Sequence, residues 1–297
     1  TMYKPLFTYL ILIGLTFVIK SASANTINAV TSFGILADVV KNVGGEHVKV
    51  TSIVPPNGDP HSYEPSPGDV KLIKSADVIF LSGMGLENWF QRLAKAAGTT
   101  TDPIAVSKGI QTYSVSAGYG NLKTDPHVWN DVDNVQVWVN NIEAALIKVR
   151  PDLTNEIQQS AQLYREKLTS LDASIHSKLA ALPTDKRDIL TSHDAFSYYT
   201  KAYGVRFLSP QGVSTETEAS ASTIAKLIDQ IKQLGVTRYF LENSNNTRLI
   251  KQIANATGAK PGGRLYPESL SEENGPAPTY IKLMQYNTQQ IVTALSE

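Results

Sequence analysis

Two of the five histidines in this chain, His61 and His127, end the same tripeptide, Asp-Pro-His. Each follows a stretch whose composition predicts a loop. A third, His193, lies between a predicted strand and a predicted helix. Imidazole is a common ligand of borderline divalent metals, so we predict that these three rings, with one later carboxylate, hold such an ion. The remaining histidines, His47 at a strand edge and His176 off the apolar stripe of a long helix, are interpreted as structural.

The repetition of the tripeptide is the observation that favours metal ligation, because an isolated loop histidine is more often a polar surface residue. Spacing alone does not choose the carboxylate. The aspartates next to the histidines, Asp59, Asp125 and Asp194, are predicted to accept hydrogen bonds from the ring N–H groups. Glu268 follows a predicted strand, but five other acids compete with it as the metal ligand: Glu216, Glu218, Glu242, Glu272 and Glu273.

The elements that must bring these residues together alternate between strand and helix. Residues 26–54 are predicted as strand, helix and strand, and the alternation resumes from residue 188. This order predicts an α/β fold with parallel sheets, because parallel strands need crossover helices between them. The three histidines and Glu268 would then all follow strands, at the sheet edge where open α/β sheets bind ligands.

A long helical stretch separates the two sets of strands. Its apolar residues recur at a mean spacing of about 3.6, the α-helical period. A helix of about 30 residues is about 45 Å long, so we expect a rigid helix that joins two lobes. The predicted division is a signal peptide (1–24), an N-terminal α/β lobe (25–150), the linking helix (151–183) and a C-terminal α/β lobe (184–297). The apolar stripe consists of Leu153, Ile157, Ala161, Tyr164, Leu168, Leu171, Ile175, Leu179 and Leu182.

Composition limits the classes of partner. Apolar residues make up 42% of the chain and charged residues 18%, which is compatible with a buried core. Lys+Arg and Asp+Glu number 27 each, and no stretch is basic enough to indicate a phosphate backbone as partner. We therefore expect no nucleic-acid partner.

The N-terminus has the features of a secretory signal peptide. Lys4 precedes an apolar run over residues 6–19, and small residues then follow in Ala-x-Ala spacing, which predicts cleavage near Ala24. The run is short for a membrane-spanning helix, which takes about 20 residues, although a membrane anchor is the alternative interpretation. The chain has no cysteine and hence no thiol for lipid attachment, disulfides or metal ligation. A free-standing periplasmic protein is the expectation.

Around the histidines the chain resembles the metal-binding solute-binding proteins of manganese and zinc ABC transporters (cluster A-I). The resemblance implies two Rossmann-like lobes on a rigid linking helix, with one metal ion between them. It places the ligands at His61, His127, His193 and Glu268, and so favours Glu268 over the other acids. It also implies a protein that is not an enzyme and that passes Mn or Zn to a membrane permease, and we expect a monomer. The similar segments are residues 59–67, 76–80, 86–89, 125–129, 192–196, 214–216 and 267–270.

Two departures from this family concern the identity of the metal. Manganese- and iron-type members usually have Glu where this chain has His193, and Asp is the commoner residue at position 268. Zinc-type members carry a long loop rich in histidine and acids before the second ligand, whereas residues 114–122 here form a short segment without histidine. The divalent affinity order predicts that such a site holds Zn more tightly than Mn.

The predicted function is capture of Mn or Zn in the periplasm and delivery of the ion to an ABC permease. Two alternatives come from other classes of protein. An exported zinc-dependent hydrolase would keep an open coordination position for a water molecule. A metal-independent adhesion module would have a stability that does not respond to metal.

Overall fold

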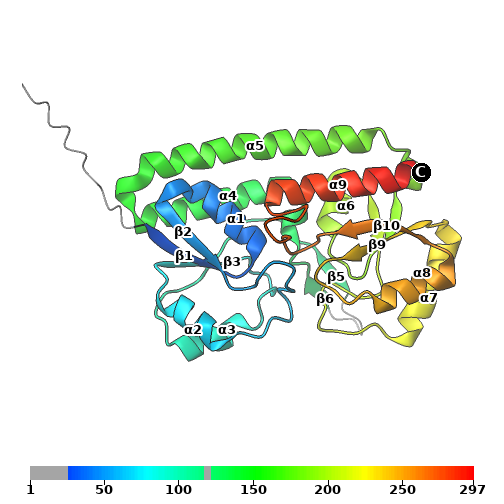
Figure 1. The fold of residues 1–297 in the computed structure, drawn as a ribbon, viewed down its shortest axis with the longest axis horizontal. Coiled ribbons are helices and arrows are strands. Elements are labelled where there is room, and N and C mark those ends of the chain that lie inside the picture. The colour runs from blue at the N-terminus through cyan, green and yellow to red at the C-terminus, as the bar shows by residue number, and fades with distance from the viewer. Residues whose placement is uncertain (1–25, 117–121) are drawn as a thin grey trace, which may run out of the picture.

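The computed structural model describes residues 26–116 and 122–297. The predicted signal peptide, residues 1–24, lies outside these described residues. The described chain forms two α/β lobes side by side, and one long helix runs along both of them (Figure 1). The predicted fold class, two lobes with parallel sheets joined by one long helix, is confirmed.

The N-terminal lobe contains a parallel four-stranded sheet in the order β2-β1-β3-β4. Its strands are β1 (Ile27–Thr31), β2 (Val48–Ser52), β3 (Val78–Leu81) and β4 (Ile104–Ala105). Because β2 and β3 lie on opposite sides of β1, the chain leaves the carboxyl end of this sheet in two directions. Such a switch point opens a crevice where α/β proteins bind ligands.

The helices of the N-terminal lobe are α1 (Gly34–Gly44), α2 (Pro67–Lys74), α3 (Phe90–Ala97) and α4 (Val132–Val149). At the start of α2, Pro67 takes the first helical position, and Ser66 and Asp69 form a capping box. An antiparallel hairpin of β5 (Ser114–Ser116) and β6 (Leu122–Thr124) then leads the chain to the second Asp-Pro-His tripeptide. Short 3-10 helices are η1 (Gly45–His47), η2 (Val128–Asn130), η3 (Pro151–Leu153) and η4 (Thr184–Lys186).

The C-terminal lobe repeats the arrangement with a parallel sheet in the order β10-β9-β7-β8. Here β7 is the strand at which the order reverses, as β1 is in the first sheet. The strands are β7 (Asp188–Leu190), β8 (Arg206–Leu208), β9 (Arg238–Glu242) and β10 (Lys260–Leu265). The helices are α6 (Ser197–Tyr203), α7 (Ala221–Leu234), α8 (Arg248–Thr257) and α9 (Tyr280–Ser296).

The linking helix is α5 (Thr154–Ala180), which at 27 residues is about 40 Å long. Its predicted apolar stripe is buried from Ile157 to Leu179. Along this stripe α5 packs against α1 and α4 of the first lobe and against α6 and α9 of the second. Both lobes therefore share one continuous apolar core along this helix. A smaller cluster lies between the second sheet and α7 and α8: Leu190, Leu208, Leu227, Ile231, Val236, Ile250 and Ile253.

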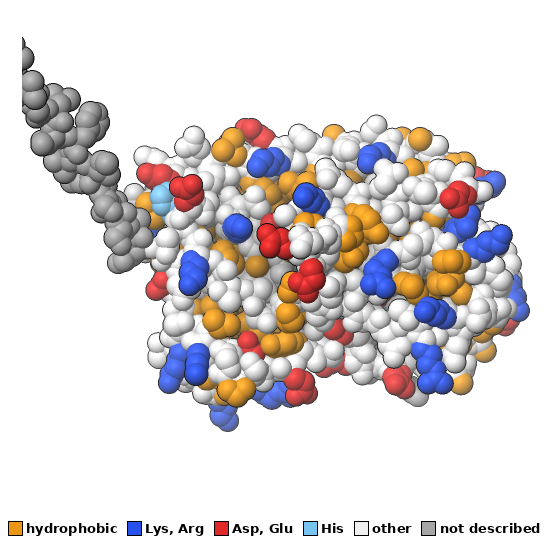
Figure 2. All heavy atoms as spheres, in the orientation of Figure 1, with side chains coloured by type: hydrophobic (Ala, Val, Ile, Leu, Met, Phe, Trp, Pro, Cys, Tyr) orange, Lys and Arg blue, Asp and Glu red, His pale blue; other side chains and the backbone are white. Residues whose placement is uncertain are grey.

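The surface matches the balanced composition of the chain. On the face drawn in Figure 2, Lys and Arg side chains are interspersed with Asp and Glu, and neither sign of charge dominates a region. Within residues 26–116 and 122–297, no helix combines the length and apolar character that crossing a membrane requires.

The shared core along α5 makes one test of stability direct. Leu168 is fully buried on α5, whereas Leu163 on the same helix is 54% exposed. We expect Leu168→Ala to lower the free energy of unfolding by about 2–5 kcal/mol, because a cavity replaces buried methyl groups. Leu163→Ala should change it by less than about 0.5 kcal/mol. Urea unfolding of both variants measures the difference, and equal losses would contradict the assignment of the buried face.

Candidate metal centre

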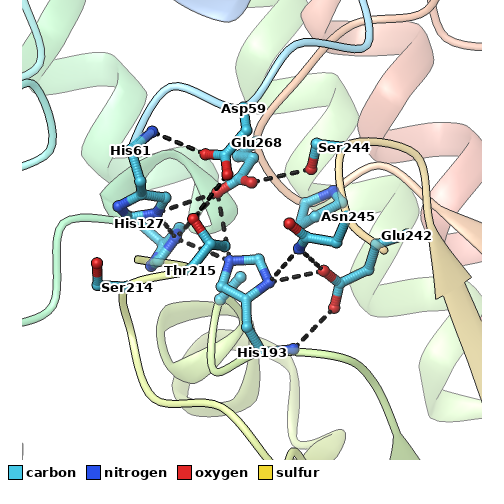
Figure 3. Close-up of polar contacts among 12 residues, drawn as sticks. Asp59, His61, His127, His193, Ser214, Thr215, Glu242, Ser244, Asn245 and Glu268 are labelled. Atoms are coloured by element: carbon cyan, nitrogen blue, oxygen red, sulfur yellow. Dashed lines mark hydrogen bonds and ion pairs between the residues drawn. The ribbon is translucent and has the colours of Figure 1, made fainter. Parts of the chain in front are cut away.

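The three predicted histidines and Glu268 meet between the two lobes (Figure 3). His61 lies in the loop after β2 and His127 follows β6, so both come from the N-terminal lobe. His193 follows β7 and Glu268 follows β10 in the C-terminal lobe. The four side chains are at most 3% exposed, and each offers one ligand atom within 4.8 Å of the other three. The structure therefore brings the three histidines together with Glu268 rather than with one of the other five acids.

Five of the six distances between these atoms match a single coordination shell. Nε2 of His127 lies 3.1 Å from Nε2 of His61 and 3.4 Å from Nε2 of His193. Oε2 of Glu268 lies between 3.1 and 3.4 Å from the same three nitrogens. A tetrahedral zinc ion with ligands at about 2.0–2.1 Å keeps adjacent ligand atoms about 3.3–3.4 Å apart. The arrangement can therefore accommodate one small divalent ion.

The oxygen of Glu268 at the centre of this group lacks a hydrogen bond. Oε1 of Glu268 accepts a hydrogen bond from the hydroxyl of Ser244 at 2.9 Å. Oε2 is buried, and among the described residues no donor reaches it with hydrogen-bond geometry. Burying a carboxylate oxygen without a partner is unfavourable, and a cation between this oxygen and the three imidazoles would compensate it.

The electrostatics of the site favour an ionised carboxylate next to positive charge. Burial raises the pKa of Glu268, but His193 and His61 outweigh burial and hold that pKa well below its usual value. Burial lowers the pKa of His193, but Glu242 and Glu268 outweigh it and raise that pKa well above its usual value. A metal ion that enters must therefore displace protons from imidazole.

The predicted hydrogen bond between Asp125 and the ring of His127 is confirmed. Oδ1 of Asp125 lies 2.8 Å from Nδ1 of His127 and 2.9 Å from its backbone nitrogen. Asp59, in the other copy of the tripeptide, has a different role. Its Oδ1 accepts the backbone N–H of His61 at 2.8 Å, and within the described residues no hydrogen bond reaches Nδ1 of that ring.

The prediction for Asp194 is wrong. Asp194 accepts a hydrogen bond from the hydroxyl of Ser197 at 3.0 Å, and the ring of His193 faces Glu242 instead. Oε2 of Glu242 lies 2.6 Å from Nδ1 of His193, and both side chains are buried. The sequence signal that could have located Glu242 is its position at the last residue of β9, at the same sheet edge as His193.

Trp129 connects the two halves of the centre. Its indole N–H donates to the carbonyl of Pro267, the residue before Glu268, at 2.8 Å. Its ring lies 5.4 Å from that of His127, and its own carbonyl accepts from the hydroxyl of Tyr280 at 2.7 Å. One buried aromatic side chain therefore fixes the distance between the first lobe and the segment that carries the carboxylate.

The loop with the first Asp-Pro-His tripeptide also reaches across to the C-terminal lobe. The backbone N–H of Asn57 donates to the carbonyl of Leu270 at 3.0 Å, and its side-chain oxygen accepts from Asn243 at 2.9 Å. Asn57 has a φ of 58°, a left-handed conformation that Asn adopts more readily than most residues. Asp59 accepts from the hydroxyl of Thr215 at 2.6 Å. These contacts hold the loop against the second lobe.

The two histidines interpreted as structural lie away from this group. His47 ends η1 and is half-buried. His176 lies on α5 with 55% of its side chain exposed, 3.7 Å from Asp172 and with its ring 5.0 Å from that of Tyr203.

Comparison with known proteins agrees with this geometry. Residues 29–294 match the family model described as zinc-uptake complex component A, periplasmic. The manganese-binding lipoprotein MntA of Halalkalibacterium halodurans is 32% identical over 277 residues, which cover 93% of this chain and 91% of that protein. The iron-binding protein YfeA of Yersinia pestis is also 32% identical, over 93% of this chain and 89% of that protein.

Solved structures share the fold at similar levels of identity. The periplasmic zinc-binding protein TroA from Treponema pallidum superimposes with a TM-score of 0.84 and 32% identity, over 91% of this chain and 99% of that chain. A Mn-bound periplasmic metal-binding protein from Candidatus Liberibacter asiaticus gives a TM-score of 0.81 with 28% identity, over 91% of this chain and 100% of that chain. The chain therefore belongs to the zinc-uptake complex component A family, the periplasmic metal-binding proteins of ABC transporters.

Proposed function

We propose that this protein captures one divalent transition-metal ion between its lobes and delivers it to the membrane permease of an ABC transporter. The observation that carries the proposal is the buried Oε2 of Glu268, which lies 3.1–3.4 Å from three imidazole nitrogens and forms no hydrogen bond of good geometry among the described residues. A cation is the group that satisfies all four atoms at once.

The proposed ligands are His61, His127, His193 and Glu268. Three neutral imidazoles and one carboxylate contribute a charge of about −1, so a bound divalent ion leaves a net charge of about +1. That residual charge suits a carrier, because a fully neutralised site would hold its ion more firmly. The two imidazoles that face buried carboxylates are further supported as ligands, since such contacts typically orient metal-bound histidine.

The metal of this site is proposed to be Mn or Zn. The names of relatives point to more than one metal: manganese for MntA, iron for YfeA and zinc for TroA. Nitrogen and carboxylate ligands accommodate all three ions, and the divalent affinity order places Zn above Mn at any such site. Transport of Mn by this chain would therefore depend on how much of each ion is present.

The observations favour the carrier over the two other classes. A hydrolytic zinc centre keeps one position open for water. Here four protein atoms already lie within 4.8 Å of one another, and all four side chains are buried. An adhesion module gives no reason to bury three histidines around one carboxylate, because burying these polar groups without a ligand lowers stability.

The proposal also includes location, state of assembly and lobe boundaries. Export through a signal peptide at residues 1–24, with cleavage near Ala24, is supported by the sequence pattern. The proposed lobes are residues 25–150 and 184–297, with residues 151–183 as the linker, which the two sheets and the position of α5 support. We propose that the mature protein acts as a monomer, because both sets of ligands come from one chain.

Metal should stabilise the folded protein, since it binds the native state and not the separated ligands. Zn at about 100 times its dissociation constant should add about 2.7 kcal/mol to the free energy of unfolding, measured as a rise in melting temperature. His127→Ala should remove most of this rise. His47→Ala is the matched control and should keep it, because His47 lies away from the four-residue group. An equal response of the two variants would contradict the proposed ligands.

Competition between the two metals tests the affinity order. We expect one equivalent of Zn to displace Mn from protein loaded with one equivalent of Mn, because imidazole-rich sites follow the divalent series. Elemental analysis of the desalted protein measures the metal retained. Retention of Mn against an equimolar amount of Zn would show that the geometry of the site overrides the series.

A further inference from the structure

Glu242 uses its two carboxylate oxygens for two separate tasks (Figure 3). Oε1 accepts the backbone N–H groups of Ser192 at 2.8 Å and of His193 at 3.1 Å. Oε2 lies 2.6 Å from Nδ1 of the His193 ring and also accepts from the side-chain amide of Asn245. Glu242 is 2% exposed, and the His193 side chain is fully buried. The backbone and the ring of one histidine are therefore both fixed by the same carboxylate.

We infer that Glu242 is a positioning residue that holds His193 in the tautomer protonated at Nδ1, so that Nε2 presents a lone pair to the metal. The inference rests on the proposed function. An ionised carboxylate can only accept hydrogen bonds, so the nitrogen that faces it carries the ring proton. A neutral imidazole has one such proton, and Nε2 is then free to coordinate. The opposite tautomer would direct an N–H group at the metal position.

Asn245 lies beside the same contact and competes for Nδ1 of His193. Its side-chain nitrogen lies 3.0 Å from Nδ1 of His193 and donates to Oε2 of Glu242. The amide could donate to Nδ1 only if Nδ1 carried no proton. Nδ1 lies closer to Oε2 of Glu242, at 2.6 Å, and a contact between two acceptor atoms at that distance needs a proton between them, so we assign the ring proton to Nδ1 and let Oε2 accept from both the ring and the amide. Oε2 of Glu242 therefore accepts two hydrogen bonds. The NH₂ group of a glutamine at this position could accept neither.

The carboxylate next to the second histidine is arranged differently. Oδ1 of Asp125 accepts both the backbone N–H and the ring N–H of His127, at 2.9 and 2.8 Å. Oδ2 is buried and has no hydrogen-bond partner among the described residues. In Asp125→Asn, the amide oxygen can take the place of Oδ1 and accept both N–H groups of His127. The amide nitrogen then takes the place of Oδ2, which has no hydrogen-bond partner among the described residues. The two carboxylates thus form a matched pair for a test.

Glu242→Gln and Asp125→Asn each remove one negative charge from a residue that faces a histidine ring. In Glu242→Gln, the oxygen stays on the two backbone N–H groups and the NH₂ group faces Nδ1. The ring must then accept at Nδ1 and carry its proton on Nε2. We expect this variant to bind Zn about 10–100-fold more weakly, the typical cost of losing such a partner. Asp125→Asn should lose several-fold less, because its ring contact is preserved.

A chelator competition titration measures both affinities, and thermal unfolding without metal verifies that both variants fold. The tautomer itself is read from the imidazole ¹⁵N shifts of the metal-free protein at alkaline pH, where the rings are neutral. Wild-type His193 should be protonated at Nδ1, and Glu242→Gln should move the proton to Nε2.

Three outcomes are decisive. Equal losses of Zn affinity in the two variants would mean that charge alone matters, and would overturn this inference. A wild-type His193 protonated at Nε2 would also overturn it, and that measurement needs no variant. Failure of the wild-type protein to bind Zn would instead overturn the proposed function, while the ¹⁵N spectrum would still report the tautomer.

Discussion

The metal centre depends on one buried contact: a carboxylate oxygen that lies among three imidazole nitrogens and forms no hydrogen bond of good geometry among the described residues. Without an ion, this buried oxygen has only the nearby imidazoles to compensate the loss of water, and none of them bonds it with good geometry. The same unfavourable contact gives the pocket its affinity for cations. The rest of the chain supplies the geometry, since no short stretch of sequence could bring these four side chains together.

Two sheets with the same strand order provide that geometry. In each parallel sheet the strand order reverses at the first strand, β1 or β7. Residues that follow strands of both sheets, His61, His193 and Glu268, meet in one group. The linking helix buries its apolar stripe in a core that both lobes share, so the lobes cannot separate without exposing apolar surface. Trp129 and the loop around Asn57 add polar contacts across the same boundary. The four side chains are therefore held at fixed spacing by packing on both sides.

The sequence predicts the parts of this structure that repeat. The 3.6-residue period locates α5 within a few residues, and the doubled tripeptide identifies His61 and His127. Contacts between distant segments are harder to predict from sequence. The contact between Glu242 and His193, for example, depends on β7 and β9 lying next to each other in the sheet. Asp194 is adjacent to His193 in sequence, yet its side chain bonds elsewhere. The two Asp-Pro-His tripeptides show the same limit. Asp125 orients the ring of His127, whereas Asp59 accepts a hydrogen bond from Thr215 and holds its loop against the second lobe.

The complete burial of the four side chains has a kinetic consequence. An ion surrounded by residues with at most 3% exposure has no route to water while the loop that carries His61 stays closed against the second lobe. Its residence time is then governed by how often the polypeptide opens, and the strength of the individual metal–ligand bonds becomes secondary. Two ions of different affinity could thus leave at similar rates, and a membrane partner that pulls this loop aside would speed the departure of either.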